Sequence, residues 1–131
     1  MRLYTEPEAR ALLPEVVPVV ERLRDAFVAL RALQSSIEAE ARGASGDGSL
    51  LANPWDQQAR ENRAESLNRQ LREAAAVLSD HGIELKDPER GLIDFHSERE
   101  GKVVYLCYLL GEPDLLYWHD LDAGFAGRQP L

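Results

Sequence analysis

The chain has 131 residues, of which 44% are hydrophobic and 29% charged, as is typical of one soluble globular domain. Its 15 basic and 23 acidic residues give a net charge of −8, which argues against a nucleic-acid surface built on clustered lysine and arginine. No apolar run approaches the ~20 residues that cross a bilayer, and the N-terminus is too acidic for a signal peptide. We therefore expect a cytoplasmic protein with one domain, 1–131, that binds neither nucleic acid nor a membrane.

The first predicted element is a helix that begins with a capping box. Thr5 and Glu8 have the spacing at which each side chain accepts a hydrogen bond from the other residue's backbone N–H. Pro14 and Pro18 then predict a kink, because an interior proline removes a backbone donor and clashes with the preceding turn. The apolar residues that follow are spaced alternately by three and four, which predicts a long helix with one seam. The seam consists of Val16, Val20, Leu23, Phe27, Leu30, Gln34, Ile37 and Ala41.

A second helix is predicted after a glycine- and serine-rich stretch, 43–53, which has the composition of a flexible connection. Asn53 before Pro54 is a start signal, and the helix is expected over 54–81 because Gly82 follows its periodic residues. Two amphipathic helices joined in this way pack most simply as an antiparallel hairpin, 1–82. The seam of the second helix is Ala64, Leu67, Leu71, Ala74 and Leu78.

From Gly82 onward the hydrophobic period changes to two, which predicts β-strands. The runs 92–97 and 102–110 predict a β-hairpin closed by 98–101, with Ser97 opposite Lys102. The run 115–121 predicts a third strand and 84–86 a fourth, followed by an irregular tail. The expected fold is therefore α+β, a long helical hairpin on a small antiparallel sheet of three to four strands within 83–131.

Both faces of the predicted β-hairpin are too apolar for one of them to face water. We expect the helices to cover one face, and the tail or a second subunit to cover the other, so a homodimer is the expected assembly. One face carries Ile93, Phe95, Val104, Leu106, Tyr108 and Leu110, and the other carries Leu92, Asp94, His96, Val103, Tyr105, Cys107 and Leu109.

Three polar residues lie in or beside these apolar runs, namely Asp94, Glu112 and His119. A carboxylate or imidazole is costly to bury unless it is paired or bound to a metal. If the three converge, they suit zinc, manganese or iron with water completing the coordination, and hydrolysis by metal-activated water is the simplest chemistry. The alternative is a hydrogen-bonded histidine beneath Trp118 and two carboxylates that bind backbone amides at turns.

Whether His119 meets Asp94 depends on the turn around Pro113. A two-residue loop places His119 on the face of Leu106, whereas a three-residue loop or a bulge places it on the face of Asp94. Both arrangements stay open at this stage.

Other candidate residues have weaker patterns. His96 follows Asp94 on the same strand face and could share a metal, but its place beside the hairpin turn favours a surface histidine. Asp120 and Asp122 resemble part of a calcium loop that lacks its remaining oxygen ligands, so calcium is not expected. Cys107 cannot form an internal disulfide, and we expect it to be an unreactive buried side chain.

Arg128 has the planar fork that binds an anionic substrate, although an internal carboxylate such as Asp122 or Glu112 is the commoner partner. No phosphate-binding loop or dinucleotide fingerprint is present, so no nucleotide cofactor is expected.

The two ends of the chain carry specific motifs, YTEPEARALLPEVVPVVERLR and, in the last third, GLIDF, LCYLLGE and YWHDLDAGFAGR. With these motifs the chain resembles an uncharacterised prokaryotic family, domain of unknown function 2203, over nearly its whole length. The resemblance implies no activity. It directs attention to the polar positions of the C-terminal motif, Asp94, Glu112, His119 and Arg128.

Overall fold

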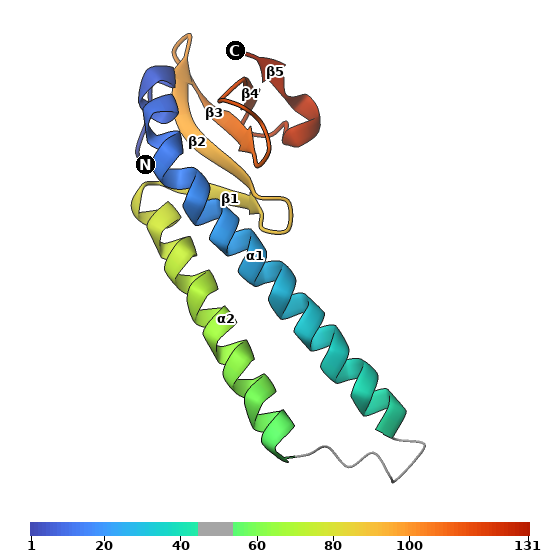
Figure 1. The fold of residues 1–131 in the computed structure, drawn as a ribbon. Coiled ribbons are helices and arrows are strands. Elements are labelled where there is room, and N and C mark those ends of the chain that lie inside the picture. The colour runs from blue at the N-terminus through green and yellow to red at the C-terminus, as the bar shows by residue number, and fades with distance from the viewer. Residues whose placement is uncertain (45–53) are drawn as a thin grey trace.

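The computed structural model describes residues 1–44 and 54–131. Residues 45–53 of the predicted flexible connection lie outside the described residues. Two helices are followed by a sheet, and Figure 1 shows the order of the elements along the chain. The elements are α1 (Glu6–Ala44), α2 (Pro54–Asp80), β1 (Ile83–Asp87), β2 (Leu92–Arg99), β3 (Lys102–Leu109), β4 (Tyr117–Asp120), the 3-10 helix η1 (Phe125–Gly127) and β5 (Gln129–Pro130).

The α+β class is confirmed, but the number of strands is not. The sheet has five antiparallel strands in the order β1-β2-β3-β4-β5, and not the expected three or four. The extra strand comes from the tail, where Tyr117 pairs with Pro130 and Trp118 with Gln129. The strand β5 has only two residues, one of them Pro130, so it shows no periodic pattern and could not be predicted from the sequence.

The register of the β2–β3 hairpin differs by two residues from the predicted one. Ser97 lies opposite Val104, and Arg99 lies opposite Lys102. The connecting turn contains only Glu100 and Gly101, whose φ angles are 53° and 77°. Two positive φ angles are the geometry of the tight turns that match the strand twist. Because the side-chain period of a strand is two, the shift leaves every residue on its predicted face.

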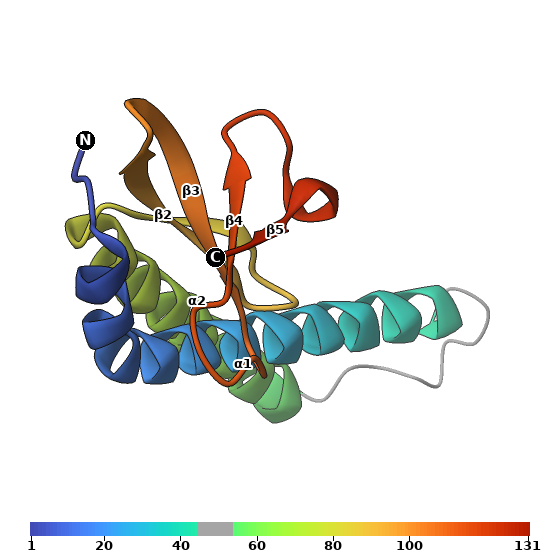
Figure 2. The same ribbon diagram turned by 90° about the horizontal axis from the view of Figure 1, so that it is seen from above.

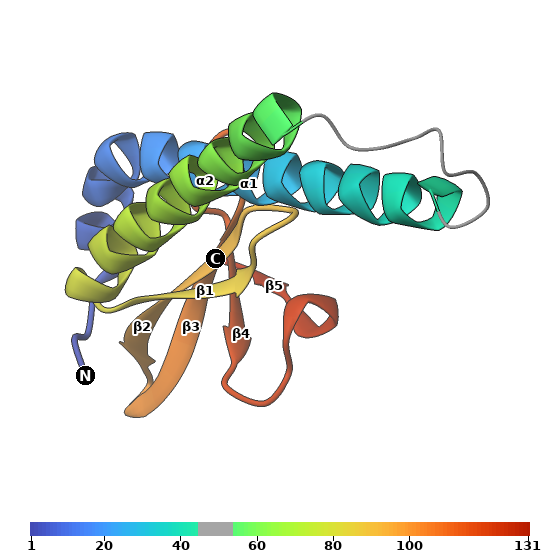
Figure 3. The same cartoon turned by 90° about the horizontal axis from the view of Figure 1, so that it is seen from below.

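Both helices lie on one side of the sheet, as Figures 2 and 3 show from two opposite directions. The core between the layers contains Phe95 and Ile93 of β2, which are fully buried, and Leu106 of β3. Both helices contribute apolar residues to this core. These are Ala9, Leu13, Val16, Val19, Val20 and Leu23 from α1, and Ala74 and Leu78 from α2.

The predicted capping box is present at the start of α1. The Thr5 N–H donates to Glu8 Oε1 at 3.0 Å, and the Glu8 N–H donates to Thr5 Oγ1 at 3.2 Å. The helix is continuous through Pro14 and Pro18, and its first turns lie at an angle to the remainder (Figure 1). Burial of the surrounding apolar side chains offsets the backbone hydrogen bonds that the two prolines remove.

The seam of α1 is buried only in its first half. A second apolar cluster joins Ala26 and Leu30 to Leu67 of α2, but Gln34, Ile37 and Ala41 are exposed. The helices diverge beyond the sheet in Figures 1 and 3, so these three residues lack the neighbour that the heptad pattern predicted. Within the described residues, no helix has both the length and the apolar character needed to cross a bilayer.

Candidate metal centre

The side chains that matter most project from the sheet face opposite the helices. Asp94 of β2 lies opposite Cys107 of β3, and Tyr105 of β3 lies opposite His119 of β4. Directly opposed residues of antiparallel strands point to the same face. The loop 110–116 is longer than the two-residue turn considered above, and it sets β4 in the register that places His119 on the face of Asp94.

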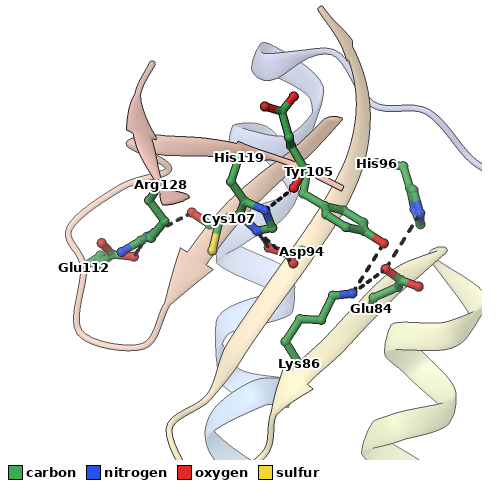
Figure 4. A network of polar contacts seen from close by, with 10 residues as sticks. Glu84, Lys86, Asp94, His96, Tyr105, Cys107, Glu112, His119 and Arg128 are labelled. Carbon is green, nitrogen blue, oxygen red and sulfur yellow. Dashed lines mark hydrogen bonds and ion pairs between the residues drawn. The ribbon is translucent and has the colours of Figure 1, made fainter. Parts of the chain in front are cut away.

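Asp94, Cys107 and His119 form a compact, buried group. Their nearest ligand atoms, one from each residue, all lie within 4.8 Å of one another. The relative exposures of the three residues are 1%, 0% and 2%, respectively. His119 Nε2 lies 3.2 Å from each carboxylate oxygen of Asp94, so this nitrogen is equally distant from the two oxygens (Figure 4).

The second ring nitrogen fixes the tautomer of His119. Nδ1 lies 2.8 Å from the backbone carbonyl oxygen of Asp120, which can only accept a hydrogen bond, so Nδ1 carries a hydrogen. The remaining nitrogen, Nε2, points its lone pair or its proton at Asp94. A neutral imidazole and an ionised carboxylate would place lone pair against lone pair, so a cation must lie between them. Either a proton or a metal ion satisfies this requirement.

Burial controls the protonation of the other two groups. It raises the pKa of the Asp94 carboxyl, while the neighbouring His119 charge and a hydrogen bond from Cys107 act in the opposite direction. Burial, followed by the charge of Asp94, raises the pKa of the Cys107 thiol to about 12. Without a bound cation the thiol therefore stays protonated.

A cysteine, a histidine and an aspartate together also resemble a nucleophilic triad, but the geometry excludes that chemistry. In such a triad the imidazole removes the thiol proton and the carboxylate orients the imidazole. Here the Cys107 thiol lies beside Asp94 within the group, and it is the backbone carbonyl of Asp120 that orients His119. A fully buried thiol with a raised pKa is also a poor nucleophile.

The group is flanked on one side by Arg128 and Glu112, as Figure 4 shows. Arg128 Nη2 donates to Glu112 Oε1 at 2.6 Å and to the carbonyl of Cys107 at 3.2 Å. The guanidinium also lies 4.1 Å above the ring of Tyr117 and 4.8 Å from that of Phe125. These contacts hold the C-terminal tail, residues 121–131, against the sheet beside Cys107.

A second polar network lies on the other side of the group (Figure 4). Lys86 Nζ donates to the Tyr105 hydroxyl at 3.4 Å and forms an ion pair with Glu84 at 3.0 Å. The Tyr105 ring connects this network to the centre, because its centroid lies 5.3 Å from that of His119 and 5.0 Å from that of His96.

Glu112 does not join Asp94 and His119. Besides binding Arg128, its Oε1 accepts the Leu109 N–H at 2.6 Å, so it closes the β3–β4 turn. The structure thus brings together two residues of the predicted triad and places the third in an ion pair. The anticipated internal carboxylate partner of Arg128 is Glu112 and not Asp122.

The remaining candidates also lie outside the group. His96 shares the sheet face but is 3.8 Å from Glu84 and 16% exposed at its side chain. Asp120 pairs with Lys102 at 3.0 Å, and only its backbone carbonyl touches His119. Asp122 is exposed in the turn after β4.

The sequence predicts Cys107 only as an unreactive buried side chain, and its place among the three possible ligands is a finding of the structure. The sequence contained a feature that could have identified Cys107 as a ligand, because strand parity alone placed Cys107 and Asp94 on one face. The predicted burial and low reactivity of the Cys107 thiol agree with the structure.

The fold and the site define an α+β protein with a helical layer on one face of its sheet and a buried Asp–Cys–His group on the other. The chain belongs to DUF2203, a family of uncharacterised conserved proteins, whose pattern matches residues 2–131. No curated protein and no solved structure matches the chain.

Proposed function

We propose that this protein binds one divalent metal ion, zinc, through Asp94, Cys107 and His119. The convergence of a carboxylate, a thiol and an imidazole within 4.8 Å is the observation that carries the proposal. Zinc accepts oxygen, sulfur and nitrogen ligands together, and iron is the nearest competitor. Manganese, which the sequence also suggested, prefers oxygen ligands and fits a thiolate less well.

The orientation of His119 supports the proposal independently. Histidines that bind metals usually donate their other ring N–H to a carbonyl or carboxylate, which fixes the tautomer and the direction of the lone pair. The Nδ1 contact with the Asp120 carbonyl is of this kind. A metal between Nε2 and the carboxylate would also replace the proton that the buried pair otherwise needs.

We assign the metal a stabilising role, in preference to the hydrolytic one that the sequence suggested. Three protein ligands leave a fourth tetrahedral position, which a catalytic zinc keeps open to water and substrate. All three ligands are buried here, so a substrate has no route to that position in this conformation. A buried metal instead stabilises the folded state in proportion to its affinity.

Elemental analysis of protein purified without an affinity tag tests the proposal. We expect about one equivalent of zinc, lost in both Cys107→Ala and His119→Ala. The matched control is His96→Ala, which removes a histidine from the same sheet face outside the group. A chelator should lower the melting temperature of the parent protein and leave that of His119→Ala unchanged. A fully folded parent protein without metal would contradict the proposal.

The second candidate is a non-catalytic module in which α1 and α2 form an antiparallel hairpin that mediates self-association. It is favoured by exposed apolar residues of α1, where Val28 is 47% exposed and Ile37 is 40% exposed. A symmetric dimer would bury such residues. Light scattering at micromolar concentration distinguishes the two states, and a mass near 14.7 kDa would remove the dimer.

A further inference from the structure

A metal ion needs a route to Asp94, Cys107 and His119, because all three side chains are buried. The helix side of the sheet offers none, since Ile93 and Phe95 are fully buried there in the apolar core. The route therefore lies on the opposite face. On that face the group has two flanks, one towards the edge strand β1 and one formed by the C-terminal tail (Figure 4).

The flank towards β1 is held by the sheet itself. Tyr105 lies in β3, and it is paired with His96 of β2 on one side and with His119 of β4 on the other. Lys86 of β1 adds its ammonium 4.4 Å from the centroid of the Tyr105 ring. Moving the backbone of Tyr105 aside breaks the centre of the sheet, which opens only at a cost close to that of global unfolding. This flank is therefore a poor route for an ion.

The tail is attached much more loosely. Residues 121–126 are all exposed, and η1 contains no buried residue. The strand β5 adds two residue pairs to the sheet, and Leu131 is partly buried beside the core. Segments with so little buried apolar surface open at a small fraction of the global free energy of unfolding. The tail is therefore the flank that opens most readily.

One aromatic ring connects the tail to the other end of this face. The guanidinium of Arg128 lies 4.8 Å from the centroid of the Phe125 ring, and that of Arg90 lies 4.6 Å from it. Arg90 belongs to the loop between β1 and β2, whereas Phe125 follows β4 in the chain. The contact therefore joins segments that β2 and β3, the strands of Asp94 and Cys107, separate in the sheet order. Contacts of a cation with an exposed ring are weak, so they break readily.

We propose that the C-terminal tail is a gate through which a divalent metal ion enters and leaves the buried group. This role rests on the proposed zinc site and adds the path to it. In the closed state Arg128 donates to the Cys107 carbonyl at 3.2 Å, and Phe125 contacts Arg90. When the tail lifts, Arg128 and Phe125 leave the face beside Cys107, while β2, β3 and β4 stay paired. Loosening such a gate speeds binding and release by the same factor, so the affinity does not change.

The rate of zinc transfer from the loaded protein to an excess of chelator tests the gate. Phe125→Ala removes the ring that contacts both guanidiniums and changes none of the three ligands. It should accelerate transfer about tenfold, because two cation–π contacts are lost. The equilibrium dissociation constant should stay within about twofold of the parent value. The Leu131 amide, which donates to the Leu116 carbonyl, should exchange faster. Arg90→Gln removes one of the two contacts and should give a smaller acceleration.

Two control variants locate the route. Asp122→Asn changes an exposed residue of the tail outside the contact, and Tyr105→Phe alters the flank towards β1. Both should transfer zinc at the parent rate. An unchanged rate in folded Phe125→Ala and Arg90→Gln proteins, or a faster rate in Tyr105→Phe alone, would overturn the gate and leave the zinc site standing. Weaker affinity without faster association in Phe125→Ala would also contradict a gate. A parent protein that binds no zinc would overturn both proposals.

Discussion

His119 on β4 and Asp94 on β2 meet at 3.2 Å across the intervening strand β3. The contact depends on two registers at once, β2 against β3 and β3 against β4. A change of one residue in either register would send one side chain to the opposite face. The contact between Asp94 and His119 therefore requires the correct register in both strand pairs.

The Asp94–His119 pair should be strongly coupled in metal-free protein. His119→Ala leaves a buried carboxylate without its partner, which we expect to lower the free energy of unfolding by about 3 kcal/mol. The double variant Asp94→Leu, His119→Leu should recover much of this loss, because apolar side chains replace both charges. Urea denaturation in the presence of a chelator measures both values. Additive losses in the double variant would show that the two residues are not coupled.

The Arg128–Glu112 pair should hold the C-terminal tail. Both side chains are mostly buried, at 11% and 16% exposure, and Glu112 also binds the Leu109 N–H. Arg128→Ala should cost about 2 kcal/mol, because it removes the charged donor that both the Glu112 carboxylate and the Cys107 carbonyl accept from. Hydrogen exchange of the Leu131 amide, which donates to the Leu116 carbonyl, should become faster.

Arg128→Lys is the matched control for that experiment. It keeps the charge but loses the planar fork that reaches Glu112 and the Cys107 carbonyl together. We expect an intermediate exchange rate at Leu131. An unchanged rate in Arg128→Ala would mean that the β4–β5 pairing alone holds the tail.

The capping box of α1 should make stability depend on acid pH. The hydrogen bond from the Thr5 backbone, followed by that from its hydroxyl, lowers the pKa of the Glu8 carboxyl. A carboxyl whose pKa is lower in the folded state stabilises the protein above its ordinary pKa, and the stabilisation is lost as the pH falls through the lowered value.

Glu8→Gln should therefore be less stable than the parent protein at about pH 6, and the difference should shrink towards about pH 3. Thermal denaturation at several pH values measures the difference. Glu15→Gln, an exposed change further along α1, serves as the control. A constant gap between Glu8→Gln and the parent protein would indicate a contribution that does not depend on the charge.

The hairpin turn offers a stabilising substitution. Glu100 has a φ of 53°, a conformation that costs free energy for most side chains and suits asparagine better. Glu100→Asn should raise the free energy of unfolding by about 0.5 kcal/mol and leave the sheet unchanged. Chemical denaturation checks the value. A loss of stability would argue that Glu100 makes a contact that outweighs its backbone strain.

Local sequence patterns predicted most of the elements. The spacing in 54–81 identified α2 to within one residue at its end, and the capping box gave the start of α1. Alternation in 92–97 and 102–110 assigned each strand residue to its face, although the predicted connection, 98–101, was two residues longer than the observed turn. These features depend on neighbours within a few positions, so the chain itself encodes them.

Contacts between segments that are distant in the sequence could be identified only from the tertiary structure. The parity of His119 depended on the length of the β3–β4 connection, and the role of Glu112 depended on where the tail returns. The exposure of Ile37 followed from the divergence of two helices, which a heptad pattern in one helix does not contain. The sequence alone predicted an α+β chain with Asp94 and Cys107 on one sheet face, and it left the face of His119 open. Only packing across three strands brought their ligand atoms within 4.8 Å, because register and loop length, and not residue type, decide which side chains meet.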